Sequence, residues 1–273
     1  MNGDIKIGII GGTGLESDLN ILTDARVMYA VETPYGKTSD ESYVEGKIGD
    51  IPVIVVGRHG KDHSISPSNV NYCANLWMLK SIGCTHVLAT TACGSLKEHI
   101  KPGTFCVIDQ YIDRTQGRRR NTLYSVSHVP QVKPFDEVLQ QILEKSCEEL
   151  NYEYHKKATT VTIEGPRFST LAESRLYQSW NCDIVNMTTV PEAQIAAELG
   201  LVYAALALVT DYDCWHCDDD ESVSVELVGK RLVDLRVRAL KVLCRAVIKC
   251  GEYDWQSIMK RKQEIASTAL MCE

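Results

Sequence analysis

Two aspartates, Asp211 and Asp213, follow a long apolar run that begins near Leu201. A run without polar alternation is typical of a strand buried on both faces, as in a parallel sheet. Ligands of open α/β sheets bind beyond the carboxyl ends of such strands. Side chains two residues apart in an extended chain point the same way, so we expect the carboxylates to lie side by side. Such a pair can accept hydrogen bonds, and one member can hold a proton. The alternative is a solvated turn.

Three other predicted strand ends carry residues that suit an anion. Gly12 and Thr13 follow a strand at residues 5–10, where backbone N–H groups and a hydroxyl can approach a phosphate. Arg58 and His59 follow a strand region at 42–56, and the Arg58 fork matches an oxyanion. Thr91 and Ala92 lie at the end of a strand that starts at residue 86. One such loop is a weak signal, but three at one sheet edge predict a phosphate site.

The glycine-rich stretch at residues 11–14 also bears on a different class of function, the binding of a dinucleotide. It resembles the dinucleotide-binding motif, but Ser17 stands where the third glycine belongs, and no clear helix opens there. This departure counts against the alternative of a Rossmann oxidoreductase or a non-catalytic nucleotide-binding domain.

Two further strand ends could contact an organic substrate. Met187 and Thr188 follow a strand that starts at residue 183, ahead of a helix that opens at Pro191 and Glu192. Thr188 is a hydrogen-bond donor and Met187 a soft apolar platform, although core packing is the simpler role for a methionine. Phe168 follows a β-branched strand at 158–163, and its position alone favours core packing over stacking on a planar ligand.

The length and composition of the chain favour one large α/β domain. The chain has 273 residues, with 44% hydrophobic and 24% charged residues. We expect a single domain over residues 1–273, with a terminal helical part at about 222–270. The expected fold class is α/β, with buried strands of the parallel type in a central sheet flanked by helices. The remaining helices are predicted at residues 68–82, 134–150, 170–180 and 191–199.

Charge and cysteine content exclude several classes of function. The net charge of -7 argues against nucleic-acid binding, and the apolar runs are too short to span a membrane. No apolar leader precedes the first strand, so the 11 cysteines indicate reduced cytosolic thiols. Cys214 and Cys217 form a C-x-x-C, but no second ligand pair supports zinc, and its position does not fit a redox motif. The arginine triplet at 118–120 is interpreted as a solvated loop.

Six segments, in this order, are similar to those of the trimeric purine nucleoside phosphorylase superfamily, and most closely to its methylthioadenosine phosphorylase family. The resemblance covers nearly the whole chain, and several segments of this length in register are highly specific. They are Gly-Ile-Ile-Gly-Gly-Thr-Gly-Leu at 8–15, Arg-His-Gly at 58–60 with His63, Thr-Thr-Ala-Cys-Gly-Ser at 90–95, Thr-Ile-Glu-Gly-Pro-Arg-Phe at 162–168, Val-Asn-Met-Thr-Thr-Val-Pro-Glu at 185–192 and Ala-Leu-Val-Thr-Asp-Tyr-Asp-Cys-Trp at 207–215.

The resemblance implies a fold of the nucleoside phosphorylase type, with a central mixed, largely parallel twisted sheet, a partly closed barrel, flanked by helices. It also implies phosphorolysis of 5'-methylthioadenosine to adenine and 5-methylthioribose 1-phosphate. Met187 would support the ribose, Phe168 would pack against base and sugar, and Thr210 would belong to the substrate site. The phosphate would lie among Thr13, Arg58, His59, Thr91, the Ala92 backbone and Thr188. Phosphate is then a co-substrate, and no metal or organic cofactor is required.

The two aspartates acquire separate roles from the same resemblance. Adenine is a poor leaving group until charge at N7 is neutralised, so Asp211 would be the acid or hydrogen-bond donor there. Asp213 would accept from the 6-amino group, which favours adenine over a 6-oxopurine. Bound phosphate would capture the oxocarbenium-like sugar and stabilise its charge.

The 5' end of the sugar would need an apolar pocket. Val225 and Val228 would supply it, and a neighbouring subunit of a homotrimer would add His128. The family usually has a bulky aliphatic residue where our alignment puts Gly229, so the pocket would be roomier and adenosine itself could be accepted.

Two alternatives within nucleoside chemistry stay open. A purine nucleoside phosphorylase of broader specificity would want Asn and Glu on the base, against which the paired aspartates argue. A hydrolytic methylthioadenosine nucleosidase would not need the anion site at Arg58 and His59. The expected role is purine and methionine salvage, and the expected location is the cytoplasm, with the nucleus as a second compartment.

Overall fold

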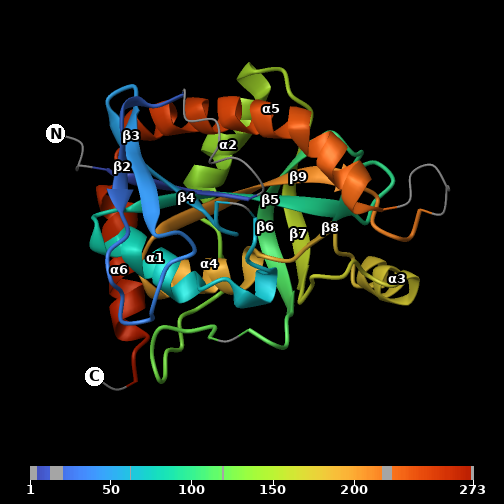
Figure 1. Ribbon diagram of the computed structural model, residues 1–273, viewed down its shortest axis with the longest axis horizontal. Coiled ribbons are helices and arrows are strands. Elements are labelled where there is room, and N and C mark those ends of the chain that lie inside the picture. The colour runs from blue at the N-terminus through green and yellow to red at the C-terminus, as the bar shows by residue number, and fades with distance from the viewer. Residues whose placement is uncertain (1–4, 13–20, 62, 119, 217–222, 272–273) are drawn as a thin grey trace.

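The computed structural model describes residues 5–12, 21–61, 63–118, 120–216 and 223–271. Within these residues, nine strands form one sheet in the order β2-β3-β4-β1-β5-β8-β7-β6-β9 (Figure 1). The strands are β1 (Ile7–Gly11), β2 (Thr23–Tyr29), β3 (Ser42–Ile48), β4 (Ile51–Gly57), β5 (His86–Ser95), β6 (Phe105–Arg114), β7 (Tyr154–Ile163), β8 (Ile184–Asn186) and β9 (Val202–Asp211).

The sheet closes on itself because β9 also pairs with β5. The ring β5-β8-β7-β6-β9 is therefore a small barrel, and β1 to β4 extend it as an open wing. Five of the nine strand pairings are parallel, namely β1–β4, β1–β5, β5–β9, β6–β7 and β7–β8. The predicted mixed, largely parallel and partly closed sheet is confirmed.

Strand β9 is buried along its whole length, as its apolar sequence predicts. Its side chains alternate between two hydrophobic cores. Leu206 and Leu208 pack with helices α2 (Glu137–Glu149) and α5 (Val225–Gly251), whereas Ala207 and Val209 belong to the core under α1 (Tyr72–Ser81) and α4 (Thr189–Glu198). Both faces of the strand are thus fixed, and so is the position of Asp211 at its end.

The helices lie on opposite sides of the sheet. Figure 1 shows α5 along one side and α1 and α4 along the other, with α3 (Leu171–Ser179) set apart at the barrel end. Helix α6 (Gln256–Thr268) packs near α4 and β9. Polar side chains define the helix starts by accepting from backbone N–H groups. These N-caps are Asn71 for α1, Asp136 for α2, Thr170 for α3 and Ser224 for α5.

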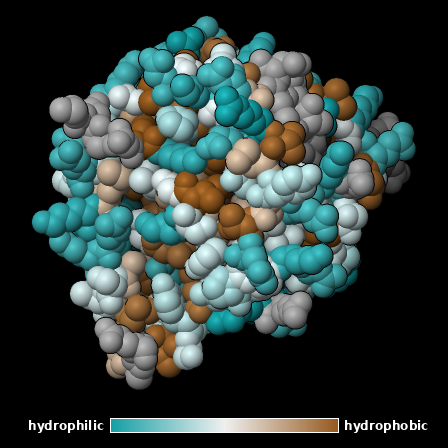
Figure 2. All heavy atoms as spheres, turned by 60° about the vertical axis from the view of Figure 1, so that its left-hand side comes forward, coloured by the Kyte–Doolittle hydropathy of each residue, from teal (hydrophilic) through white to brown (hydrophobic). Residues whose placement is uncertain are grey.

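Strand β2 is the most exposed strand of the sheet. Each of its residues is exposed, and among the described strands it pairs with β3 alone. On this side of the molecule hydrophobic residues occur in small groups between hydrophilic ones (Figure 2). No helix among the described residues is long and apolar enough to cross a membrane. Nine cysteines lie in the described part of the chain, and all are free thiols.

Candidate active site

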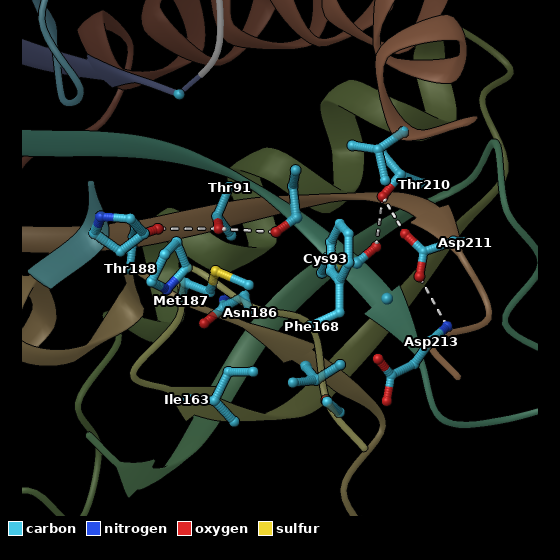
Figure 3. A pocket seen from close by; sticks show the side chains of 18 of the residues that line it. Thr91, Cys93, Ile163, Phe168, Asn186, Met187, Thr188, Thr210, Asp211 and Asp213 are labelled. Carbon is cyan, nitrogen blue, oxygen red and sulfur yellow. Dashed lines mark hydrogen bonds between the residues drawn. The ribbon is translucent and has the colours of Figure 1, made fainter. Parts of the chain in front are cut away.

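One cavity of about 250 Å³ opens where the carboxyl ends of β4, β5, β8 and β9 meet. Thr91 and Thr188 lie at one end of it and the two aspartates at the other, with Phe168 between them (Figure 3). Its lining residues are Gly12, Arg58, His59, His63, Pro67, Thr91, Ala92, Cys93, Gly94, Ile163, Pro166, Phe168, Ser169, Val185, Asn186, Met187, Thr188, Thr210, Asp211, Asp213 and Val228.

Asp211 is the last residue of β9 and is only 3% exposed. Its Oδ1 accepts from the Asp213 backbone N–H at 2.8 Å, and its Oδ2 accepts from the Thr210 hydroxyl at 2.6 Å. Burial raises the pKa of Asp211 to about 6, and the negative charge of Asp213 adds to this shift. The hydrogen bonds from Thr210 and Asp213, and the charge of Arg231 on α5, oppose it. A carboxyl with this pKa can be protonated near neutral pH and can act as an acid.

Asp213 lines the same cavity as Asp211, but its backbone conformation differs from the predicted one. The residue lies in the turn after β9 with a φ of 52°, in the left-handed region, so it does not continue an extended strand. Asp tolerates this conformation better than most residues. Burial raises the pKa of Asp213, while the nearby Ser174 and Ser169 hydroxyls oppose the shift. The pair therefore lines one pocket, but by a turn rather than by the two-residue repeat of a strand.

Gly94 makes this arrangement possible. A Cβ at this position would lie 2.8 Å from Asp211 Oδ1 and 3.1 Å from Asp213 Cβ. Gly94 is also the register partner of Asp211 across the β5–β9 pairing, beyond an irregularity at Cys93. The absence of a side chain lets the carboxylate lie directly on β5.

The opposite end of the cavity holds hydrogen-bond donors for an anion. Arg58 follows β4, is 1% exposed and donates through Nη1 to the Thr90 carbonyl oxygen at 2.8 Å. The hydroxyls of Thr91 and Thr188 are 3.2 Å apart and both are buried. Thr188 lies just before α4, whose regular helical turns begin only after Val190, a residue with non-helical φ and ψ.

His59 is held as a neutral ring. Its Nδ1 lies 2.8 Å from the Ile65 carbonyl oxygen, which can only accept, so Nδ1 carries the proton. Burial and the neighbouring Arg58 charge lower the pKa of His59 to about 4. The cationic group at this end of the cavity is therefore Arg58, and His59 contributes a polar ring.

Arg118 is not the solvated residue that the sequence predicted. Its side chain is 4% exposed, and Nη2 donates to the Met187 carbonyl oxygen at 2.6 Å and to the Ile163 carbonyl oxygen at 3.2 Å. Its guanidinium also lies 5.7 Å from the Tyr72 ring centre. Arg118 thus fixes the backbone beneath Met187 from outside the cavity. Arg120 is exposed, as expected, and residue 119 lies outside the described residues.

Eleven of the fifteen predicted site residues line the cavity, and Val225 and Gly229 do not. Arg58, His59, Thr91, Ala92, Phe168, Met187, Thr188, Thr210, Asp211, Asp213 and Val228 all line the cavity. Thr13 lies outside the described residues. Val225 is 80% exposed, and Gly229, which follows Val228 on α5, has nothing within 4 Å of the point where a Cβ would lie. His128 is exposed, and its backbone N–H donates to the Ala269 carbonyl oxygen.

The sequence prediction missed several lining residues. Cys93, Gly94 and Asn186 belong to quoted segments, yet only their contacts reveal that they face the cavity. Ser169 adjoins Phe168 and could have been found from that neighbour. Among the described residues, no three His, Cys, Asp or Glu side chains gather in a way that could hold a metal ion.

Comparisons with known proteins agree with this geometry. The sequence profile of the phosphorylase superfamily matches residues 6–248. The chain is 48% identical over 274 residues to S-methyl-5'-thioadenosine phosphorylase of Ciona intestinalis, covering 97% of this chain and 96% of the relative. Its identity to the Danio rerio enzyme of the same name is 44% over 278 residues, covering 99% and 98%.

Solved structures give the same result. Methylthioadenosine phosphorylase from Schistosoma mansoni in complex with adenine superposes with a TM-score of 0.93 at 40% identity, covering 98% of this chain and 99% of that chain. A mutant of adenosine/methylthioadenosine phosphorylase from the same organism, in complex with methylthioadenosine, gives a TM-score of 0.90 at 40% identity, with the same coverage. The chain therefore belongs to the phosphorylase superfamily and, within it, to the family of the S-methyl-5'-thioadenosine phosphorylases.

Proposed function

We propose that the protein catalyses the reversible phosphorolysis of 5'-methylthioadenosine, which gives adenine and 5-methylthioribose 1-phosphate. One observation carries this proposal: a single cavity holds an anion site at Arg58, Thr91 and Thr188 and, at its other end, a buried carboxyl pair. The reaction needs both, because phosphate must attack the sugar while the departing base is neutralised.

In the proposed complex the base lies against Asp211 and Asp213. Asp211, with a pKa raised to about 6, donates a proton or a hydrogen bond to N7 as the glycosidic bond breaks. Asp213 accepts from the 6-amino group and so favours adenine. Phe168 and Met187 line the space between the two ends and would pack against base and ribose.

Phosphate occupies the other end of the cavity in this proposal. The charge of Arg58 and the hydroxyls of Thr91 and Thr188 hold it, and its negative charge stabilises the oxocarbenium-like sugar before C–O bond formation. Thr13 and the Ala92 backbone complete the proposed phosphate contacts. The reaction as proposed uses phosphate as co-substrate and no metal or organic cofactor.

A phosphate-dependence assay tests the proposal. Purified protein should release adenine from 5'-methylthioadenosine only when phosphate is present, with 5-methylthioribose 1-phosphate as the second product. Adenine release at an equal rate without phosphate would instead identify a hydrolytic nucleosidase. A higher catalytic efficiency with inosine or guanosine would identify a purine nucleoside phosphorylase of broader specificity.

The proposal includes adenosine as a second substrate. Val228 lines the cavity, and Gly229 places no side chain beside it on α5. A relative from Schistosoma mansoni bears the name adenosine/methylthioadenosine phosphorylase. Comparing kcat/KM for the two nucleosides in the wild type and in Gly229→Leu tests this part. A strong preference for methylthioadenosine that Gly229→Leu leaves unchanged would contradict it.

The proposal extends to assembly and cellular role. We place the protein in purine and methionine salvage in the cytoplasm, with the nucleus as a second compartment. In a homotrimer, a neighbouring subunit would bring His128 to the 5' end of the sugar. A measured mass of one or two chains in solution would contradict the trimer.

A further inference from the structure

The guanidinium of Arg58 is held almost completely by other protein groups. Nε donates to Glu192 Oε2 at 2.6 Å, Nη2 donates to Glu192 Oε1 at 2.8 Å, and Nη1 donates to the Thr90 carbonyl oxygen. An arginine has five N–H donors, so these bonds leave one on Nη1 and one on Nη2. Since Arg58 lines the cavity, two donors in a fixed plane remain for an oxyanion.

Glu192 itself does not line the cavity. It is 1% exposed and lies in the first turn of α4, four residues after Thr188. Its Oε1 also accepts from the Tyr203 hydroxyl at 2.8 Å, and Tyr203 belongs to β9 and is 2% exposed. Three hydrogen bonds from two different elements therefore fix this carboxylate.

The charges of this buried group are balanced before any ligand arrives. Burial alone would lower the pKa of Arg58, but the Glu192 carboxylate raises it above its ordinary value, so the guanidinium stays charged. Burying an ion pair seldom stabilises a fold more than apolar packing would. The arrangement is better explained by orientation, since a guanidinium fixed in advance loses little freedom when it binds an anion.

We propose that Glu192 is a positioning residue for the phosphate co-substrate: it fixes the plane of Arg58, and Tyr203 fixes Glu192 in turn. Glu192 touches no substrate and acts only through Arg58. Thr188 and Glu192 lie four residues apart, on either side of the non-helical Val190, so one short segment contributes to the phosphate end of the cavity twice. This inference rests on the proposed phosphorolysis.

The decisive variant is Glu192→Gln in the full-length protein. An amide cannot accept both Arg58 hydrogen bonds, so the KM for phosphate should rise about tenfold or more. The Kd for adenine, measured without phosphate, should change less than about threefold, because Asp211 and Asp213 are untouched. An unchanged phosphate KM, or an equal loss of both affinities, would overturn the inference.

Glu198→Gln is the matched control. Glu198 lies on the same helix and is 3% exposed, but its carboxylate accepts from the Thr122 hydroxyl and the Leu123 backbone N–H. It should leave the phosphate KM unchanged. If the phosphate KM of Glu198→Gln rose as much as that of Glu192→Gln, the effect of Glu192→Gln would be a general disturbance of α4, and the inference would be overturned.

Tyr203→Phe decides the question if Glu192→Gln does not fold. This change keeps the ion pair and removes one donor to Glu192, so the phosphate KM should rise about two- to fivefold with adenine affinity unchanged. No rise in a folded Tyr203→Phe protein would contradict the inference. Failure of the proposed phosphorolysis can be told apart from failure of this inference. If the wild-type protein releases adenine without phosphate, it has no KM for phosphate that a variant could change.

Discussion

The Thr210 hydroxyl lies 2.6 Å from Asp211 Oδ2 and 3.1 Å from the Cys93 carbonyl oxygen. A hydroxyl carries one hydrogen, which cannot serve both acceptors fully. Thr210 therefore connects the protonation of Asp211 to the backbone of β5. The charge on this carboxyl depends on a neighbour that can either donate to it or accept from it.

Asp211→Asn should lower kcat/KM for methylthioadenosine by about 10²- to 10⁴-fold, because the amide cannot supply an acidic proton. In the wild type the acid is present below the pKa of Asp211 and is lost as pH rises through it, so kcat/KM should fall above about pH 6. Ionisation of free phosphate affects the wild type and Asp211→Asn equally, so a difference between their pH profiles reports on Asp211. Identical pH profiles for wild type and Asp211→Asn would contradict the assignment.

Thr210→Val should move the wild-type pH profile to higher pH. The Thr210 hydrogen bond lowers the pKa of Asp211, so its loss leaves the effect of burial less opposed. Thr210→Ser keeps the hydroxyl and should retain the wild-type midpoint. A shift to lower pH in Thr210→Val would show that Thr210 accepts from a protonated Asp211 and donates to Cys93.

Asp213→Asn should change base selectivity toward 6-oxopurines, since an amide can donate to O6 where a carboxylate repels it. We expect the ratio of kcat/KM for methylthioadenosine over inosine to fall about 10- to 100-fold. Asn tolerates the left-handed conformation of this position as well as Asp does, so the backbone should be undisturbed. Unchanged selectivity would remove Asp213 from its proposed role.

Gly94→Ala should lower kcat/KM by about 10²-fold, because its Cβ would displace the Asp211 carboxylate by a fraction of an ångström or more. Gly8→Ala is the control, since a Cβ there would lie 2.9 Å from Leu79 Cδ1 and Gly8 does not line the cavity. Both variants should be compared by kcat/KM and by Tm. Equal activity in the two would show that close approach at Gly94 is unimportant for the chemistry.

Arg118→Lys should weaken nucleoside binding while leaving the phosphate KM unchanged. A lysine is shorter and has no planar guanidinium to lie over the Tyr72 ring, so its ammonium should support the Met187 backbone less well. We expect the KM for methylthioadenosine to rise about tenfold and the free energy of unfolding to fall about 2 kcal/mol. A rise in the phosphate KM without a rise in the KM for methylthioadenosine would contradict this prediction, because it would show that Arg118 supports the phosphate end of the cavity.

The parts of the site that follow buried strands could be predicted from local sequence. The apolar run of β9 and the polar residues after it are visible without a structure, as are Arg58 and Met187 directly after their own strands. Thr91 also lines the cavity, but it lies inside β5, which continues to Ser95, and not at the predicted strand end. Local pattern also identified the helices, although the one predicted at 68–82 divides into a 3-10 turn, Pro67–Asn69, and α1.

The rest depends on contacts between distant residues. Arg118 is one of three consecutive arginines, and its burial comes from carbonyl groups 45 and 69 residues away. The partner of Arg58 is 134 residues further along the chain. Asp213 reaches the cavity through a positive φ, which the residue type permits but does not demand. Partial closure of the sheet was expected from the family resemblance, but no local pattern indicates that β5 and β9 are the strands that close it.

The β5–β9 pairing joins strands more than a hundred residues apart, and it also brings Cys93 to Thr210 and Gly94 to Asp211. Contacts of such long sequence separation form slowly, because a large loop must close before they contribute to stability. A collapsed chain with its helices formed would therefore still lack both ends of the cavity. During refolding, recovery of activity should follow recovery of helical signal and should report when the barrel closes.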